Sequence, residues 1–246
     1  MKDGKNIRCN QKIFVAENSI LPDPSTNDNY AIRLASRNGH ADIVKYLLSQ
    51  ERVDPSALDN YAVRYASWKG HVEVVKLLLA DSRVDPGADY SFAIRVASAD
   101  GHVEVVKLLL ADSRVDPGDL CNQAIRDASR KMHVEVVKLL LGDSRVDPGD
   151  WDNEAIRDAS EEGHEELVKL LLADYRVDPG ADYNYAIRKA CRNGHIEVVK
   201  LLLAHNWVHP GDLFNEAIRD AFQNGHVEVV KLLLADPRVD PKALNY

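Results

Sequence analysis

Histidine is the residue type with the widest scope for chemistry in this chain of 246 residues, because its imidazole exchanges protons near neutral pH and binds metal ions. Seven of the nine histidines recur at intervals of 31 residues: His40, His71, His102, His133, His164, His195 and His226. A group that recurs seven times in one local context is better explained by a structural role than by seven active sites. We predict that these imidazoles form hydrogen bonds with the backbone of a turn.

The other two histidines lie where a repeated motif is broken. Three copies of the motif read Asp-Ser-Arg-Val-Asp, and every copy but this one keeps Arg-Val-Asp, whereas this copy reads His205-Asn206-Trp207-Val208-His209. Two histidines would hold zinc only with a third and a fourth ligand, and no cysteine or carboxylate is suitably spaced. We therefore predict no metal site here and a partner contact at Trp207, since tryptophan is enriched at binding hot spots.

Arginine recurs in two columns, and both are expected to be structural. The first column follows Ala-Ile or Ala-Val, from Arg33 to Arg219, and the second consists of Arg52, Arg83, Arg114, Arg145, Arg176 and Arg238. Asp54, Asp85, Asp116, Asp147, Asp178 and Asp240 recur beside the second column, so we expect ion pairs between the two sets. The sequence contains no Gly-rich phosphate loop, nucleophile elbow, paired-Cys zinc spacing or kinase signature. We predict that the protein is not an enzyme and uses no cofactor.

Charge and composition limit the partners and the compartment. The net charge is −8, which disfavours nucleic acid and anionic membranes as partners. No apolar run approaches the roughly 18 residues of a membrane span. The three cysteines are odd in number and unrelated in position, and residues 1–10 are too polar for a signal peptide. We expect a cytoplasmic or nuclear protein.

The elements that position these residues follow from the spacing of apolar side chains. Residues 71–81 show apolar positions around most of a helical circumference, which predicts a buried helix. Residues 60–67 predict a shorter helix before it, with N-caps in the column Asn29, Asn60, Ser91, Asn122, Asn153, Asn184 and Asn215. Glycines such as Gly70 lie between the two helices, where a left-handed residue ends the first one.

This unit of helix, Gly turn, helix and Asp-Pro turn, with Gly-His before the second helix, resembles the ankyrin repeat over residues 23–241. The familiar Thr-Pro-Leu-His opening is replaced by Tyr30-Ala31-Ile32-Arg33, and the period is 31 residues instead of about 33. The resemblance implies an all-α repeat solenoid of stacked helix-turn-helix repeats with short hairpin turns. It also implies a scaffold that binds a protein or peptide in a concave groove lined by the first helices.

Variable positions on the first helices indicate where a partner would bind. They change from aromatic in the first three repeats to mostly charged in the last four. Grouped aromatics are the usual anchors of a binding surface, although drift at unconstrained solvent positions would also give variation. The apolar residues at the hairpin tips lie beside this face. The predicted partner-binding residues are Tyr30, Tyr61, Tyr65, Trp68, Phe92, Trp151, Asp158, Tyr185 and Trp207.

The two ends of the chain lie outside the seven complete repeats. Residues 1–22 are interpreted as a degenerate N-terminal cap and residues 242–246 as the start of an eighth repeat. The last second helix is as apolar as the internal ones, so we expect the C-terminal repeat to stack on further repeats or to self-associate. The main alternative function is a structural spacer of a longer array, which the near-identical second helices favour. A consensus-derived artificial chain is a third possibility, which the irregular fourth and sixth repeats oppose.

Overall fold

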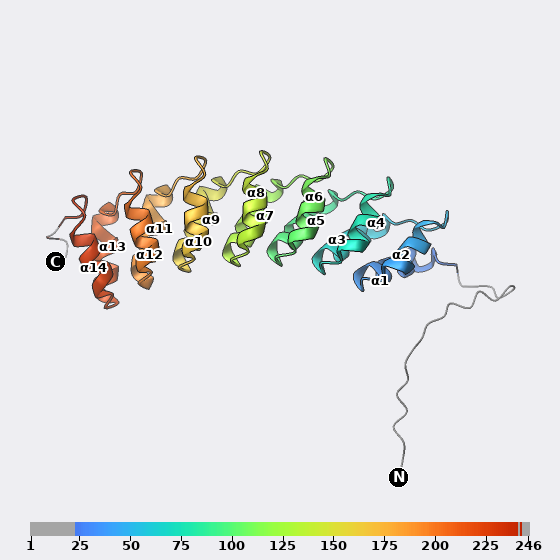
Figure 1. The fold of residues 1–246 in the computed structure, drawn as a ribbon, viewed down its shortest axis with the longest axis horizontal. Coiled ribbons are helices and arrows are strands. Elements are labelled where there is room, and N and C mark those ends of the chain that lie inside the picture. Colours follow the sequence, from blue (N-terminus) through green and yellow to red (C-terminus); the bar gives the residue numbers. More distant parts are fainter. Residues whose placement is uncertain (1–22, 241, 243–246) are drawn as a thin grey trace, which may run out of the picture.

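The seven repeats form a row of helix pairs. The computed structural model describes residues 23–240 and residue 242, and these contain fourteen α-helices and no strand. Each helix pair lies beside the next, with the two ends of the described chain at opposite ends of the row (Figure 1). Each first helix contacts the first helices of its neighbours, and each second helix the neighbouring second helices. The predicted helix-turn-helix solenoid is therefore confirmed. The predicted cap at residues 1–22 lies outside the described residues, as does most of 242–246.

The helix bounds repeat with the period of the sequence. The first helices of repeats one to seven are α1 (Thr26–Arg37), α3 (Ala57–Trp68), α5 (Ala88–Ala99), α7 (Asp119–Arg130), α9 (Asp150–Glu161), α11 (Ala181–Asn193) and α13 (Asp212–Gln223). The second helices are α2 (Ala41–Leu48), α4 (Val72–Leu79), α6 (Val103–Leu110), α8 (Val134–Leu141), α10 (Glu165–Leu172), α12 (Ile196–Leu203) and α14 (Val227–Leu234). We number the repeats by these pairs and call the contact between two successive repeats a junction.

The core is a line of small and branched side chains running the length of the row. In repeat three, Ile94 and Ala97 of α5 and Val106 and Leu109 of α6 are fully buried, and the equivalent residues of the other internal repeats are too. Full burial of one such Leu or Ile contributes roughly 1.5–3 kcal/mol. The small alanines let the first helices approach closely, so each repeat is stable only against its neighbours.

Each first helix opens with three residues in the left-handed conformation, which the sequence analysis did not anticipate. In α3 these are Leu58, Asp59 and Asn60, with φ between 53° and 57°. The predicted N-cap role of the asparagine column is therefore wrong. Asn60 is itself left-handed, and its Oδ1 accepts the backbone N–H of Asp85 in the next repeat at 2.7 Å. The side chain thus joins two repeats instead of capping one helix.

The motif arginines hold this left-handed turn in place. Arg95 donates from Nε to the carbonyl of Tyr90 at 2.8 Å and from Nη2 to the carbonyl of Asp89 at 3.0 Å. Equivalent bonds form in the other repeats. A left-handed residue other than glycine costs roughly 1–2 kcal/mol, and hydrogen bonds from a charged donor offset that cost at about 1.5–3 kcal/mol each. The structural role predicted for this column is confirmed.

The recurring histidines bind the turn of the preceding repeat. Nε2 of His102 lies 2.9 Å from the carbonyl oxygen of Trp68, and its ring rests on Gly70, where a Cβ would lie 2.6 Å from Nδ1. His71, His133, His195 and His226 make the same hydrogen bond. The predicted bond to a turn backbone is confirmed, and its acceptor belongs to the neighbouring repeat.

Met132 takes the place of this glycine in repeat four. It is left-handed, with φ 59°, and it carries the Cβ that the histidine seat excludes. The imidazole of His164, which would occupy that seat, forms no hydrogen bond with the described residues. One substitution in repeat four therefore removes a contact made by repeat five.

The second arginine column pairs with a different aspartate from the predicted one. Arg114 forms two hydrogen bonds with the carboxylate of Asp112, at 2.9 and 2.6 Å, and this contact lowers the pKa of Asp112. It also donates to the carbonyls of Val84 at 2.8 Å and Leu79 at 3.0 Å in the preceding repeat. The predicted pairing with Asp54, Asp85, Asp116, Asp147, Asp178 and Asp240 is wrong, because those carboxylates accept backbone N–H groups of their own turns, as Asp116 does from Gly118. Arg52 is the exception in the column, since it pairs at 3.7 Å with Asp23, which occupies the equivalent position in repeat one.

Candidate partner-binding surface

The first-helix face of repeat two carries an aromatic cluster. Tyr61, Tyr65 and Trp68 follow one another by one helical turn along α3. The rings of Tyr61 and Tyr65 are stacked with centroids 3.8 Å apart, and Trp68 meets Tyr65 edge to face at 5.5 Å. All three side chains are half-buried, so part of each ring is already in contact with the protein. The cluster is consequently rigid, with its remaining ring surface facing solvent.

Cations of the chain flank these rings and those of the neighbouring repeats. The guanidinium of Arg33 lies 5.3 Å from the ring centroid of Tyr61, and that of Arg64 lies 4.8 Å from Phe92. Nζ of Lys69 lies 3.9 Å from the ring of Trp68. Phe92 is half-buried and Tyr30 is exposed. The predicted aromatic residues of repeats one to three thus lie together on one face, as a mixed aromatic and cationic surface.

The same face of repeats four to seven is crossed by ion pairs. Arg130 binds Asp158 through Nε and Glu154 through Nη2, both at 2.8 Å, and Glu154 also pairs with Arg126. Burial raises the pKa of the Asp158 carboxyl, and the hydrogen bond from Arg130 acts in the opposite direction. Tyr185 donates its hydroxyl to Glu161 at 2.8 Å. Asp158 and Tyr185, both predicted to bind a partner, are already held by side chains of neighbouring repeats.

Large apolar side chains are also exposed on the left-handed turns. Repeats two to seven each expose a large apolar residue there, at the first or the second left-handed position, and repeat seven exposes Leu213 as well as Phe214. We call the following set the tip row: Leu58, Tyr90, Leu120, Trp151, Tyr183 and Phe214. Trp151 is 59% exposed and Phe214 is 88% exposed. The predicted site residue Trp151 belongs to this row, with the guanidinium of Arg126 4.5 Å from its ring.

An acidic hollow lies beside Trp151 between repeats five and six. It has a volume of about 600 Å³ and is lined by backbone and side chains that include Asp147, Asp150, Asp152, Asp178 and Asp182. Arg157 approaches Asp182 at 3.5 Å, and no other cation forms an ion pair with these five carboxylates among the described residues. A positively charged group is the ligand that such a hollow favours.

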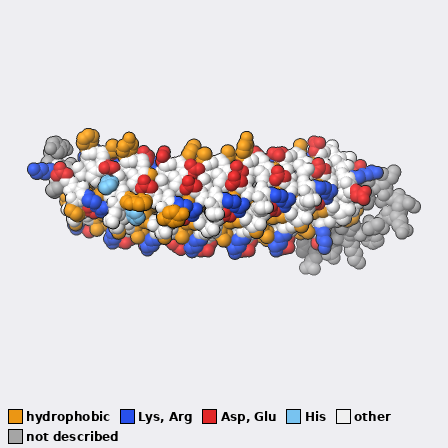
Figure 2. All heavy atoms as spheres, turned by 90° about the horizontal axis from the view of Figure 1, so that it is seen from above, with side chains coloured by type: hydrophobic (Ala, Val, Ile, Leu, Met, Phe, Trp, Pro, Cys, Tyr) orange, Lys and Arg blue, Asp and Glu red, His pale blue; other side chains and the backbone are white. Residues whose placement is uncertain are grey.

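Trp207 interrupts the row of basic side chains on the loop surface. Figure 2 shows basic groups spaced along the middle of this surface, with hydrophobic and histidine side chains among them near the C-terminal end. Trp207 is 55% exposed, and its ring meets that of His205 edge to face at 5.6 Å. Tyr175, which the sequence analysis did not single out, is exposed in the preceding repeat. Its one signal is a tyrosine in a position that three repeats fill with serine and no other repeat fills with an aromatic residue.

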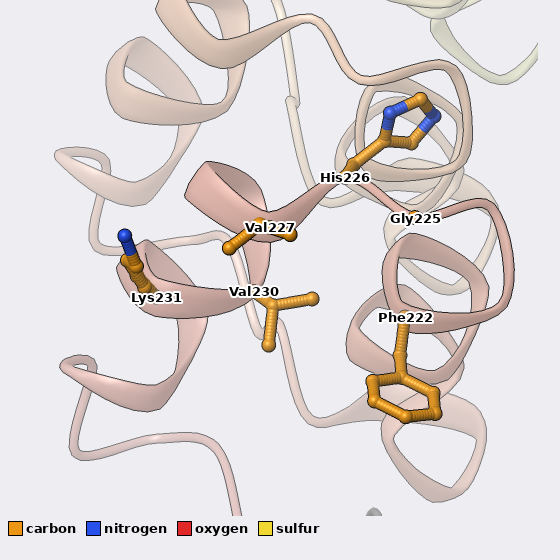
Figure 3. A pocket seen from close by; sticks show the side chains of 6 residues that line it. All are labelled: Phe222, Gly225, His226, Val227, Val230 and Lys231. Carbon is orange, nitrogen blue, oxygen red and sulfur yellow. The ribbon is translucent and has the colours of Figure 1, made fainter.

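The outer face of repeat seven is apolar. Phe222, Gly225, His226, Val227, Val230 and Lys231 line a hollow of about 310 Å³ (Figure 3). At the junction before it, a Cβ on Gly194 would lie 2.5 Å from His226, whereas a Cβ on Gly225 would meet no atom within 4 Å. Val227 is 61% exposed. This surface matches the one that each internal repeat presents to its neighbour.

The part of the chain that the structure describes shows neither a metal-binding group nor a membrane-spanning helix. Residues 23–240 contain no group of three His, Cys, Asp or Glu side chains that could hold a metal ion. None of their helices combines the length and the hydrophobicity that crossing a bilayer requires. Cys191 is buried, which raises the pKa of its thiol, and Cys121 is a free, exposed thiol.

Comparison with known proteins supports the fold. The family model described as Ankyrin repeats (3 copies) matches residues 5–90 and 156–245. The crystal structure of EF0377, an ankyrin repeat protein, aligns with a TM-score of 0.63 and 23% identity over 72% of this chain and 98% of that one. The human ASB11 ankyrin repeat domain aligns with a TM-score of 0.58 and 18% identity over 76% of this chain and 95% of that one. Comparison with curated proteins gives no match.

Proposed function

This chain belongs to the ankyrin repeat family, and from that premise we propose that it is a protein-binding scaffold whose partner lies along the tip row and the adjoining first-helix face. Ankyrin repeats generally bind other proteins, and members of the family are typically not enzymes. The observation that carries the proposal is the tip row itself. Single exposed apolar residues are normal on any surface, but here the left-handed turn of every repeat from two to seven exposes a large apolar residue, at one of two adjacent positions.

The two halves of the first-helix face would contribute differently. Tyr61, Tyr65 and Trp68 are held rigidly by their own stacking, so a partner that contacts them pays little side-chain entropy. The carboxylates and guanidinium groups of repeats four to seven already satisfy one another, so a partner must match their charges to gain affinity. We therefore assign the anchoring contacts to the aromatic cluster and the tip row.

A capture experiment tests this proposal. The intact chain and a variant carrying Tyr90→Ser, Trp151→Ser and Tyr183→Ser are used as baits, and the captured proteins are identified by mass spectrometry. All three side chains are exposed, so the variant is expected to fold. We expect a specific partner to be captured by the intact chain and lost, by at least tenfold, from the variant.

A matched control removes aromatic surface elsewhere. The variant Tyr46→Ser with Tyr175→Ser changes two exposed aromatics that lie outside the tip row, and it is expected to capture the same partner as the intact chain. A spacer without a dedicated partner predicts no specific capture by any of the three baits. Equal capture by all three would place the binding surface elsewhere.

A second proposal concerns the outer face of repeat seven. At every internal junction this surface is covered by the next repeat, and its hollow beside Gly225 has the shape that receives a Gly-His histidine. We propose that it receives a further repeat, for which a second copy of the chain is a source in solution. Sedimentation equilibrium tests this association. We expect it to be concentration-dependent and to weaken by at least tenfold with Val227→Glu, while a monomer at all concentrations would exclude the second copy.

A further inference from the structure

Five junctions show how this fold receives a guanidinium group. The arginines Arg83, Arg114, Arg145, Arg176 and Arg238 each donate to two carbonyls of the preceding repeat. One acceptor is a valine 30 residues earlier, at 2.7–2.9 Å. The other is a leucine 35 residues earlier, at 2.6–3.2 Å. The pair of carbonyls is therefore a recurrent receptor for a planar, five-donor cation.

The junction between repeats five and six has the receptor but not the arginine. Trp207 stands in the arginine column and His205 in the column of its aspartate partner. The corresponding carbonyls, of Leu172 and Val177, accept no hydrogen bond from any described residue. Nδ1 of His205 is buried and also has no partner among the described residues. Three polar atoms at this junction thus lack the partner that the other junctions supply.

The surroundings of this place favour a cation. At the regular junctions the arginine is attracted electrostatically by the Val-Asp-Pro aspartate 29 residues earlier, as Arg176 is by Asp147. Asp178 is the corresponding residue here, and it is exposed and lines the acidic hollow of about 600 Å³. Trp207 adds an exposed indole face, and such a face attracts guanidinium groups.

We propose that the junction of repeats five and six binds an arginine side chain from a basic segment of a protein partner. The guanidinium stacks on Trp207 and donates to the carbonyls of Leu172 and Val177, as the chain's own arginines do elsewhere. The residues that flank it in the partner extend over Asp178 toward Trp151 and the acidic hollow. This inference rests on the proposed scaffold function and adds the chemistry of one partner residue.

Arginine suits this place better than lysine. The guanidinium has a planar fork that reaches two carbonyls at once and a flat face that stacks on an indole, whereas an ammonium is a compact, strongly hydrated point charge. Citrulline has nearly the shape of arginine and carries no charge. Comparing the three side chains therefore separates shape, charge and the guanidinium fork.

The test uses NMR of the full chain, which has three tryptophans, Trp68, Trp151 and Trp207, and hence three indole N–H signals. A blocked pentapeptide with the sequence Gly-Arg-Gly-Arg-Gly is titrated, alongside its lysine and citrulline counterparts. We expect the arginine peptide to move the signals of Trp207 and Trp151 but not that of Trp68. We expect the lysine peptide to bind at least fivefold more weakly and the citrulline peptide to cause no movement.

A rebuilt junction provides the matched control. His205→Asp with Trp207→Arg restores the motif of the regular repeats, and its own arginine then occupies the two carbonyls. We expect the arginine peptide to bind this variant at least tenfold more weakly, as reported by the Trp151 signal. The reverse change, Asp112→His with Arg114→Trp in repeat three, creates the receptor without the acidic hollow and is expected to bind more weakly than the native junction.

The outcomes distinguish this inference from the proposed function. Equal binding of the lysine and arginine peptides, or unchanged binding to the rebuilt junction, would overturn the arginine site. Movement of Trp68 alone would overturn it as well. The scaffold proposal fails separately, when the tip-row variant captures the same proteins as the intact chain.

Discussion

The junction between repeats two and three has both recurrent turn contacts, the histidine bond and the arginine bonds, whereas each junction of repeat five lacks one of them. At the regular junction His102 binds the carbonyl of Trp68 at 2.9 Å, and Arg114 binds two carbonyls of repeat two. Toward repeat four, His164 has no such bond among the described residues, and toward repeat six Trp207 replaces the arginine. The comparison shows that each repeat is held by contacts its neighbour must supply.

The first-helix face keeps side-chain contacts at both of these junctions. Arg126 and Arg130 of repeat four pair with Glu154 and Asp158 of repeat five. Toward repeat six, the hydroxyl of Tyr185 donates to Glu161 at 2.8 Å. Repeats two and three instead meet on this face through Arg64, which lies over Phe92 and pairs with Asp89 at 3.0 Å. The contacts between first helices and the contacts made by the turns are therefore independent of each other. A turn contact can be lost while the first helices of the two repeats remain in contact.

The largest expected loss in the free energy of unfolding comes from adding a Cβ at Gly70, the position of the regular junction that corresponds to Met132. Gly70 has φ +71°, and a Cβ there would lie 2.6 Å from Nδ1 of His102. We expect Gly70→Ala to cost about 2–3 kcal/mol, from backbone strain and from the displaced histidine with its hydrogen bond. Urea unfolding and amide hydrogen exchange in α4 and α6 measure this loss.

Gly225 supplies the control for this change. It has nearly the same backbone conformation, φ +76°, but a Cβ there would meet no atom within 4 Å. Gly225→Ala should therefore cost only the strain, about 1 kcal/mol. Equal losses in the two variants would show that the histidine seat contributes nothing to the junction.

The second effect concerns the arginine column. Arg114→Met removes the donor to Val84 and Leu79 and leaves the carboxylate of Asp112 without its partner, so we expect a loss of about 2 kcal/mol. Trp207→Met, in the same column, removes a side chain that forms no hydrogen bond with the described residues, and should cost less than about 1 kcal/mol. Hydrogen exchange at the two junctions compares them, and a larger cost at Trp207 would refute the assignment of the guanidinium as an inter-repeat tie.

A smaller, stabilising effect is expected at Met132. Met132→Gly relieves a left-handed methionine and clears the seat for His164, so it should stabilise repeats four and five by about 1 kcal/mol. His164→Ala should then be nearly neutral in the native background and cost about 1 kcal/mol in the Met132→Gly background. This double-mutant cycle measures the coupling directly, and additive effects would mean that the histidine does not return to its seat.

The smallest effect is the acid dependence of the arginine column. The hydrogen bond from Arg114 lowers the pKa of Asp112, so this contact stabilises the protein fully above the ordinary aspartate pKa of about 3.9. The contribution disappears as the pH falls through the lower, folded-state pKa. The stability difference between the native chain and Asp112→Asn should be constant from pH 7 to 5 and fade below about pH 4.

A neutral comparison completes the acid experiment. Asp42 forms no ion pair or side-chain hydrogen bond with any described residue, so Asp42→Asn should give a stability difference that changes little with pH. A difference for Asp112→Asn that grows as the pH falls would contradict the assigned sign.

The helix-turn-helix solenoid followed from the sequence because its determinants are local. The period of 31 residues, the apolar spacing of residues 71–81 and the glycine between the helices all act within one repeat. The arrangement of the predicted partner-binding residues followed from the sequence only in part. Tyr61, Tyr65 and Trp68 lie together because helical spacing places them on one side, but their stacking and half-burial depend on neighbouring side chains.

The sequence by itself determined which elements form and which residues recur at each junction. The tertiary structure decided which of the recurring residues meet. Asn60 accepts the backbone N–H of Asp85 in place of capping its own helix, and Arg114 pairs with Asp112 and not with Asp116. Met132 occupies the space in which the imidazole of His164 would lie. The first and the third depend on a left-handed backbone and on the stacking distance between repeats, whereas the pair of Arg114 and Asp112 forms within one turn while the same guanidinium reaches the preceding repeat. A periodic sequence lists the available donors and acceptors, and only the stacked geometry brings particular pairs within hydrogen-bonding distance.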